Sequence, residues 1–96
     1  MVIVITYDEN GGWWDHVAPP KGDKLGPSSR IPAIIVSPYA KRGFVDHTAY
    51  DTASIQRLLN KRFSLTPLAG LTARDQALAG QGEAPMGDLT NALQFP

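Results

Sequence analysis

Four side chains that can bind a cation stand close together near the start of the chain, namely Asp8, Glu9, Asp15 and His16. Asp8 and Glu9 stand one residue after residues 2–6, a β-prone run without polar alternation that predicts a strand covered on both faces. Unpaired carboxylates at the end of a buried strand are costly, and a bound cation would offset that cost. The pattern therefore indicates a divalent metal ion held by Asp8 and Glu9.

The next three residues decide whether the two carboxylates can reach one ion. Successive side chains of a strand point to opposite faces, so Asp8 and Glu9 can share one ion only if the backbone leaves strand geometry between them. Asn10, Gly11 and Gly12 permit positive φ and could supply that break. The alternative is a solvated hairpin turn, because Asn-Gly between apolar runs is typical of hairpins. The residues after the turn do not alternate, which argues against a returning strand.

Length and composition indicate one globular domain over residues 1–96. The chain is 43% hydrophobic and 19% charged, which is usual for a folded protein. Its nine basic and nine acidic residues balance without a basic block, so nucleic-acid binding has no electrostatic basis. No apolar run approaches the roughly 20 residues of a transmembrane segment, and no signal peptide is recognisable. With no cysteine, disulfides and thiolate chemistry are excluded.

The elements that must position the acidic pair predict a small α/β fold. Residues 31–36 form a second apolar run, hence a second buried strand, and the Pro-, Gly- and Ser-rich residues 17–30 form a loop. Residues 51–63 predict the one clear amphipathic helix, with Asp51 as its N-cap. Residues 71–78 and 88–93 predict one or two short helices, whose apolar side chains Leu89, Ala92, Leu93 and Phe95 would dock on the body.

The predicted helix at 51–63 has two contrasting sides. We expect its apolar stripe to pack against the fold and its polar side to face water. The stripe consists of Ile55, Leu58, Leu59 and Phe63, and the polar side of Gln56, Arg57, Asn60 and Lys61.

Two further residues have both a chemical and a structural interpretation. Ser37 follows the second strand, where a nucleophile could stand, but Pro38 and the missing Gly-x-Ser-x-Gly elbow favour a rigid strand exit. His47 follows Asp46 shortly before the helix, where it is either a hydrogen-bonded structural residue or a further member of the acidic site.

Several segments of the chain resemble, in order, the C-terminal part of the bacterial phosphoesterase family. That family includes the phosphatidylcholine-type phospholipases C and related acid phosphatases. The resemblance covers nearly the whole chain, and its first segment is the most specific. The segments are residues 6–17 (TYDENGGWWDHV), 30–40 (RIPAIIVSPYA), 45–48 (VDHT), 50–51, 54–55, 62–63 and 72–75 (TARD).

The resemblance implies a partial alkaline-phosphatase-like sandwich that takes part in metal-dependent hydrolysis of phosphate esters or phospholipid headgroups. It implies Asp8 and Glu9 as ligands of a divalent metal ion of unknown identity. It leaves Asn10, Asp15, His16 and His47 as candidates for supporting the ligands or contacting the substrate. The family's nucleophile lies upstream of the matched segments, so Ser37 does not inherit that role. We therefore expect a C-terminal segment, inactive alone, from a family whose members are often periplasmic or secreted.

Two function classes stay open. The first is a hydrolase segment that needs a missing N-terminal part, on the same or another chain. The second is a stand-alone metal- or ligand-binding or assembly module without catalysis. In that module Trp13, Trp14 and Tyr39 would contact a sugar, a lipid headgroup or a partner, unless the tryptophans pack into the core. Since one helix cannot cover both faces of two apolar strands, we also expect a homodimer or larger oligomer.

Overall fold

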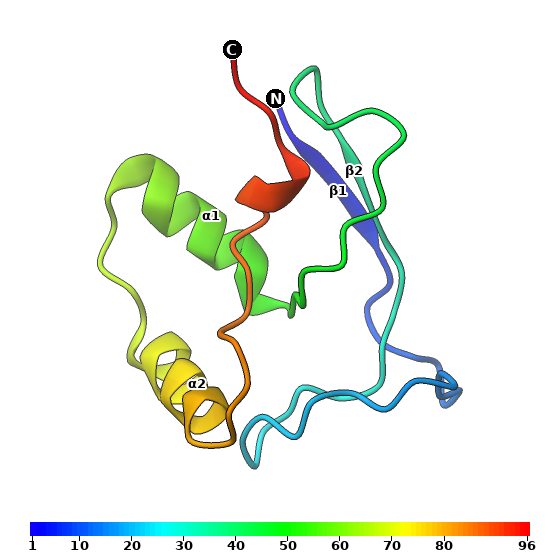
Figure 1. Cartoon of the computed structure of the whole chain (residues 1–96), viewed down its shortest axis with the longest axis vertical. Helices are drawn as coiled ribbons and strands as arrows, with labels where there is room; N and C mark the ends of the chain where they lie inside the picture. The colour runs from blue at the N-terminus through cyan, green and yellow to red at the C-terminus, as the bar shows by residue number, and fades with distance from the viewer.

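The computed structural model describes all 96 residues and confirms the α/β class (Figure 1). Neither of its two helices has the length and apolar character needed to cross a bilayer. The helices and strands agree in order with the prediction, and α2 starts slightly earlier than expected. In chain order they are β1 (Ile3–Thr6), β2 (Ala33–Val36), α1 (Ala53–Phe63), α2 (Ala69–Ala79) and the short 3-10 helix η1 (Thr90–Ala92).

The sheet consists of β1 and β2 alone, paired antiparallel. Ile3 lies opposite Val36 and Ile5 lies opposite Ile34. The chain between the strands makes a long excursion away from them before it returns, so this pair is not a tight hairpin (Figure 1). At the open end of the pair, the hydroxyl of Thr6 donates to the carbonyl of Pro32 at 2.8 Å.

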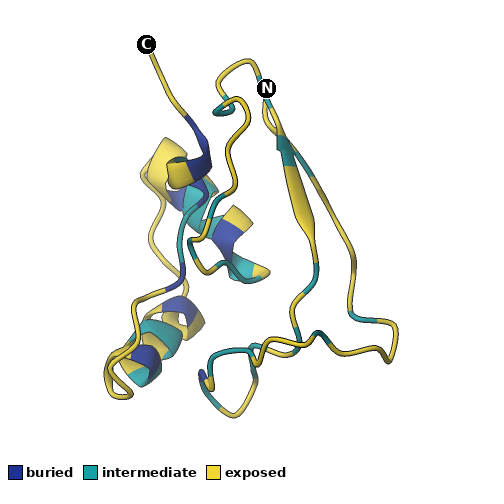
Figure 2. Cartoon of the chain, turned by 45° about the vertical axis from the view of Figure 1, so that its right-hand side comes forward, coloured by how far each residue is buried: buried dark blue, intermediate teal, exposed yellow.

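The prediction that both strands are buried on both faces is wrong for this chain. Ile3, Ile5, Ile34 and Val36 point to one face, which we call the exposed sheet face, and they are 44%, 54%, 60% and 47% exposed. The side chains on the other face are half-buried at best. The reason is placement: both helices lie to one side, and neither packs extensively against the sheet (Figure 2).

Helix α1 departs from the prediction at most positions of both sides, although Leu58 is half-buried and Lys61 is exposed, as expected. Three residues of its apolar stripe are exposed: Ile55 and Leu59 expose about two fifths of their surface and Phe63 exposes 59%. Ser54 and Asn60 are buried instead. Gln56 and Arg57 are half-buried instead of solvent-facing, and the guanidinium of Arg57 donates to Asp75 of α2 at 2.8 Å. The side-chain oxygen of Asn60 accepts from the side-chain amide of Gln56 at 2.9 Å. The backbone carbonyl of Asn60 accepts from the backbone amide of Leu65 at 2.9 Å.

Asp51 holds the start of α1 from one residue before the N-cap position, which is Thr52 and not Asp51 as predicted. Its carboxylate accepts from the amide of Ala53 at 2.9 Å, and its own amide donates to the hydroxyl of Ser54 at 3.0 Å. Thr52 occupies the N-cap position itself but forms no capping hydrogen bond with its side chain. The reciprocal pair of bonds fixes where the helix begins.

The core is small and lies between the helices and the C-terminal segment. Leu78 is fully buried. The predicted docking of the C-terminal segment is confirmed for Leu89, Ala92 and Leu93, which are buried. Phe95 is exposed, but its ring packs against that of Tyr39 with the ring centroids 5.4 Å apart. The amide of Gln94 donates to the carbonyl of Tyr39 at 2.7 Å, which links this segment to the exit of β2. The buried apolar residues are Leu71, Leu78, Met86, Leu89, Ala92 and Leu93.

We predict that the purified chain forms a homodimer or larger oligomer. The exposed sheet face is apolar and both outer strand edges are unpaired, and a second copy could cover them. Light scattering behind a sizing column should give at least twice the 10.4 kDa of one chain. The double variant Ile5→Thr/Ile34→Thr keeps β-branched side chains but removes apolar surface, and should shift the protein toward the monomer.

The matched control is Leu25→Thr, at an apolar loop residue that is 83% exposed and lies outside the sheet. This variant should keep the oligomeric state of the unmodified protein. A folded 10.4 kDa monomer of the unmodified chain at micromolar concentration would contradict the prediction.

Candidate functional site

The acidic pair lies at the start of a sharp turn after β1, as predicted. Gly11 and Gly12 have φ values of +64° and +83°, a backbone conformation that residues with a side chain rarely adopt. The amide of Trp13 donates to the carbonyl of Asn10 at 3.0 Å and closes the turn. Strand β1 ends at Thr6 and the backbone bends at Asp8 and Glu9, so both carboxylates lie outside strand geometry.

Asp8 and Glu9 are both exposed, and neither forms an ion pair with a lysine, arginine or histidine. One oxygen of Glu9 accepts from the amide of Gly11 at 2.8 Å, while the side-chain oxygen of Asn10 accepts from the amide of Gly12 at 2.9 Å. These bonds orient Glu9 and Asn10 without neutralising any charge. The carboxylates of the turn therefore remain available to a cation.

Asp15 and His16 are engaged with each other and with Arg30. One carboxylate oxygen of Asp15 lies 2.5 Å from Nε of Arg30, and the other lies 2.6 Å from Nδ1 of His16. The hydrogen bond from Arg30 is the main cause that lowers the pKa of Asp15. No three Asp, Glu or His side chains in the chain gather closely enough to hold a metal ion together. The acidic pair thus stands without a third protein ligand.

Of the predicted Asp46-His47 pair, only Asp46 belongs to a hydrogen-bond network, which is separate from the acidic turn. The hydroxyl of Tyr50 donates to Asp46 at 2.5 Å, the side-chain amide of Asn91 donates at 2.7 Å and the amide of Thr48 donates at 3.0 Å. Burial acts to raise the pKa of Asp46, but these hydrogen bonds outweigh it and lower the pKa to about 2. Burial and the bond to Asp46 raise the pKa of Tyr50 to about 12. His47 is exposed beside this network.

Sequence reasoning gave no role to Arg74, which joins three parts of the chain. Its guanidinium donates to Asp23 at 2.6 Å and to Asp51 at 3.1 Å, an arrangement we call the Arg74 clasp. Nearby, the side-chain amide of Gln81 donates to the carbonyl of Gly22 at 2.6 Å. The clasp holds the long loop against the helices. The only signal in the sequence was the family-like segment 72–75, which does not reveal partners 51 and 23 residues away.

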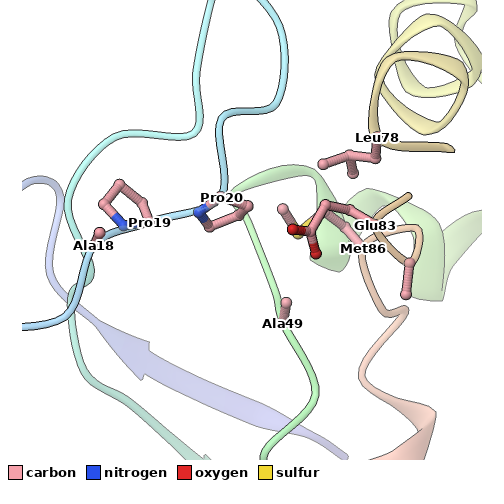
Figure 3. A pocket seen from close by; sticks show the side chains of 8 residues that line it. Ala18, Pro19, Pro20, Ala49, Leu78, Glu83 and Met86 are labelled. Carbon is pink, nitrogen blue, oxygen red and sulfur yellow. The ribbon is translucent and has the colours of Figure 1, made fainter. Parts of the chain in front are cut away.

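A hollow of about 350 Å³ lies on another part of the molecule (Figure 3). Its walls are mainly apolar, and the carboxylate of Glu83 lies among them (Figure 3). None of the predicted site residues lines this hollow, so it is not part of the acidic turn. The lining residues are Ala18, Pro19, Pro20, Ala49, Leu78, Glu83, Ala84 and Met86.

Comparisons with known proteins agree with the resemblance seen in the sequence. The sequence model of the Phosphoesterase family matches residues 1–66. Phospholipase C B of Mycobacterium tuberculosis (strain ATCC 25618 / H37Rv) is 30% identical over 118 residues, which cover 97% of this chain and 21% of that protein. The non-hemolytic phospholipase C of Burkholderia pseudomallei (strain K96243) is 31% identical over 121 residues, which cover 97% of this chain and 16% of that protein.

A plant relative is similar over a shorter stretch. Non-specific phospholipase C6 of Arabidopsis thaliana is 33% identical over 91 residues, which cover 68% of this chain and 17% of that protein. The chain therefore spans about a fifth of the length of these relatives, or less. No solved structure matches the chain, so the alkaline-phosphatase-like sandwich stays a prediction.

The Asp46–Tyr50 bond generates a prediction about pH. Because the folded pKa of Asp46 lies near 2 and its ordinary value is 3.8, its stabilisation is present above about pH 4 and is lost as the pH falls toward 2. Tyr50→Phe removes one donor, so the acid unfolding midpoint, followed by circular dichroism, should rise by roughly half to one pH unit.

The Tyr50→Phe variant should also differ from the unmodified chain in its stability at alkaline pH. Tyr50 contributes stability below pH 10, its ordinary pKa, and this contribution is lost as the pH rises through about 12. Tyr50→Phe should lack that alkaline loss. Tyr7→Phe is the control, because it makes the same substitution at a tyrosine whose side chain is 65% exposed. Identical acid midpoints for the Tyr50 and Tyr7 variants would contradict this account.

Proposed function

The chain belongs to the phosphoesterase family, and from that premise we propose that it supplies metal-binding carboxylates to a phospholipase C-like phosphoesterase. The observation that carries this proposal is the exposed pair Asp8 and Glu9, free of cationic partners at a sharp turn after β1. A carboxylate pair that has no ion-pair partner within its own chain is suited to an external cation. The proposed substrates are phosphate esters, including phospholipid headgroups.

The donor set fits a divalent cation in kind but is incomplete in number. Carboxylate oxygens suit hard or borderline cations, which take six or more ligands in the case of calcium. Asp8 and Glu9 offer few of these, and Asn10, Asp15, His16 and His47 are proposed to support them or to contact the substrate. When bound, the cation would polarise a phosphoryl oxygen and stabilise developing charge. The other ligands would be water, substrate or residues outside this chain.

The chain's own residues offer no prepared nucleophile. The hydroxyl of Ser37 donates to the carbonyl of Met1 at 3.0 Å and accepts from the amide of Tyr39 at 3.2 Å, which supports its structural role at the strand exit. His16 contacts Asp15, and no hydroxyl is hydrogen-bonded to a histidine. Since an activated hydroxyl nucleophile needs an adjacent base or metal, we propose that catalysis requires a further, N-terminal part on the same or another chain.

The second candidate function is a binding or assembly module without catalysis. The observation in its favour is that Trp13 and Trp14 are 83% and 80% exposed and therefore free to contact a ligand or partner. Such a module would need no nucleophile. It differs from the first proposal in that the carboxylates would not have to bind a metal.

Metal binding provides the test. We expect calorimetric titrations with manganese, calcium and zinc to show weak binding by the unmodified chain, with a Kd of about 10⁻⁴ M or higher, because the site has few protein ligands. The double variant Asp8→Asn/Glu9→Gln keeps side-chain size and hydrogen-bonding capacity but removes both charges. It should abolish the heat of binding.

Glu83→Gln is the matched control, because Glu83 is exposed but lies in the hollow away from the acidic turn. It should bind metal as the unmodified chain does. If the unmodified chain and Asp8→Asn/Glu9→Gln gave equal heats, the acidic pair would not be the metal site and the proposal would be wrong.

A further inference from the structure

The hollow in Figure 3 lies where the long loop meets the helical part of the chain. Pro19 and Pro20 form its loop side, while the buried side chains of Leu78 and Met86 contribute to the side formed by α2 and the segment that follows it. Its volume of about 350 Å³ is in the range of small-molecule sites, and its walls are mainly apolar. The hollow is therefore suited to a compact hydrocarbon group.

Hydrogen bonds hold the two sides of the hollow in place. The side-chain amide of Gln81 donates to the carbonyl of Gly22 at 2.6 Å and joins the turn after α2 to the loop. The backbone amide of Glu83 donates to the carbonyl of Leu78 at 2.9 Å, which fixes the backbone of Glu83 relative to the end of α2. The Arg74 clasp joins the same loop to α2 a short way along the chain.

A close backbone approach at Gly87 fixes the position of Met86. The amide of Gly87 donates to the carbonyl of Ala49 at 2.8 Å. A Cβ atom on Gly87 would lie only 2.5 Å from the ring of Tyr50, so a larger residue would push this segment away from Ala49. The hollow is thus formed before any ligand arrives, which lowers the cost of binding.

Two opposite charges stand at the hollow and at its continuation. Glu83 lies in the hollow, and its carboxylate points from the helical side toward Pro20 (Figure 3). Glu83 and the two prolines also line an adjoining hollow of about 440 Å³, to which Lys21 and Gln81 contribute. Neither Glu83 nor Lys21 forms an ion pair within the chain. An apolar hollow, a free carboxylate and a free ammonium group therefore follow one another along the surface.

This order of groups is complementary to an α-amino acid that has an apolar side chain. The hydrocarbon side chain suits the apolar hollow, the α-ammonium group suits Glu83, and the α-carboxylate suits Lys21. A simple alkylamine would leave Lys21 without a partner. A fatty acid would bring its carboxylate into the neighbourhood of Glu83, which would repel it.

We propose that the hollow and its continuation bind a free apolar α-amino acid, such as leucine or methionine. Its side chain lies among Pro19, Leu78 and Met86, and its two charged groups pair with Glu83 and Lys21. The site is separate from the acidic turn. The proposal therefore goes beyond the proposed function and does not depend on it.

An NMR titration of the ¹⁵N-labelled chain with L-leucine tests the proposal. We expect saturable shifts at the amides of Ala49, Glu83 and Ala84, with a Kd on the order of a millimolar because so small a ligand gains little free energy. Glycine has both charges but no side chain, and should bind about tenfold more weakly. Leucinamide and 4-methylpentanoate each lack one of the two charges, and each should bind about fivefold more weakly than leucine.

Variants of the two charged residues provide a second readout. Glu83→Gln and Lys21→Met each remove one charge with little change in side-chain length, and each should weaken leucine binding about fivefold. Glu83→Asp keeps the charge and should retain part of the affinity. Lys24→Met is the matched control for Lys21→Met, because Lys24 is exposed on the same loop but lines neither hollow. It should bind leucine as the unmodified chain does.

Four results would overturn the proposal. They are the absence of saturable shifts with leucine, equal binding of glycine and leucine, equal binding of leucinamide and leucine, or an equal loss of affinity in Lys24→Met and Lys21→Met. Equal binding of glycine would show that the apolar hollow is not used. Equal binding of leucinamide would show that Lys21 does not recognise the α-carboxylate.

Discussion

The contact on which the arrangement of the chain most depends is the Arg74 clasp. One guanidinium on α2 holds Asp23 in the long loop and Asp51 at the start of α1. Asp51 is only 7% exposed and Arg74 only 16%, so removal of Arg74 would leave the carboxylate of Asp51 poorly solvated and without its cationic partner. The clasp therefore sets the path of the loop relative to both helices. Since that loop leads from the acidic turn to β2, it also constrains where the turn lies.

Ion pairs hold α1 against α2 and against the C-terminal segment of the chain. Arg57 on α1 forms a bidentate ion pair with Asp75 on α2, in which its two terminal guanidinium nitrogens lie 2.8 and 2.9 Å from the carboxylate oxygens. The ammonium group of Lys61 donates to the carboxylate of Asp88 at 2.9 Å. These pairs turn the polar side of α1 inward, so its apolar stripe faces solvent together with the exposed sheet face. The helical part and the sheet are thus joined by hydrogen bonds and short contacts around Tyr39 more than by a shared core.

The sequence predicted what local chemistry decides. Continuous β-prone residues identified both strands, Gly11 and Gly12 identified the sharp turn, and periodicity identified α1. The sequence did not predict which faces of the strands and of α1 are buried. An apolar strand indicates that something covers it, but the pattern does not say whether the cover belongs to the same chain. For α1, the partner of Arg57 is 18 residues away, and no periodicity reveals that an ion pair outweighs the burial of Ile55 and Leu59. The Arg74 clasp was missed for the same reason.

We infer that this chain holds part of a metal site but no nucleophile. Hydrolysis of p-nitrophenyl phosphate tests it most directly, with the purified chain and with Asp8→Asn/Glu9→Gln, each in excess manganese, calcium or zinc. We expect the background rate for both proteins, because phosphoryl transfer needs a positioned nucleophile as well as charge stabilisation. A metal-dependent turnover that survives repurification and is lost in Asp8→Asn/Glu9→Gln would contradict it.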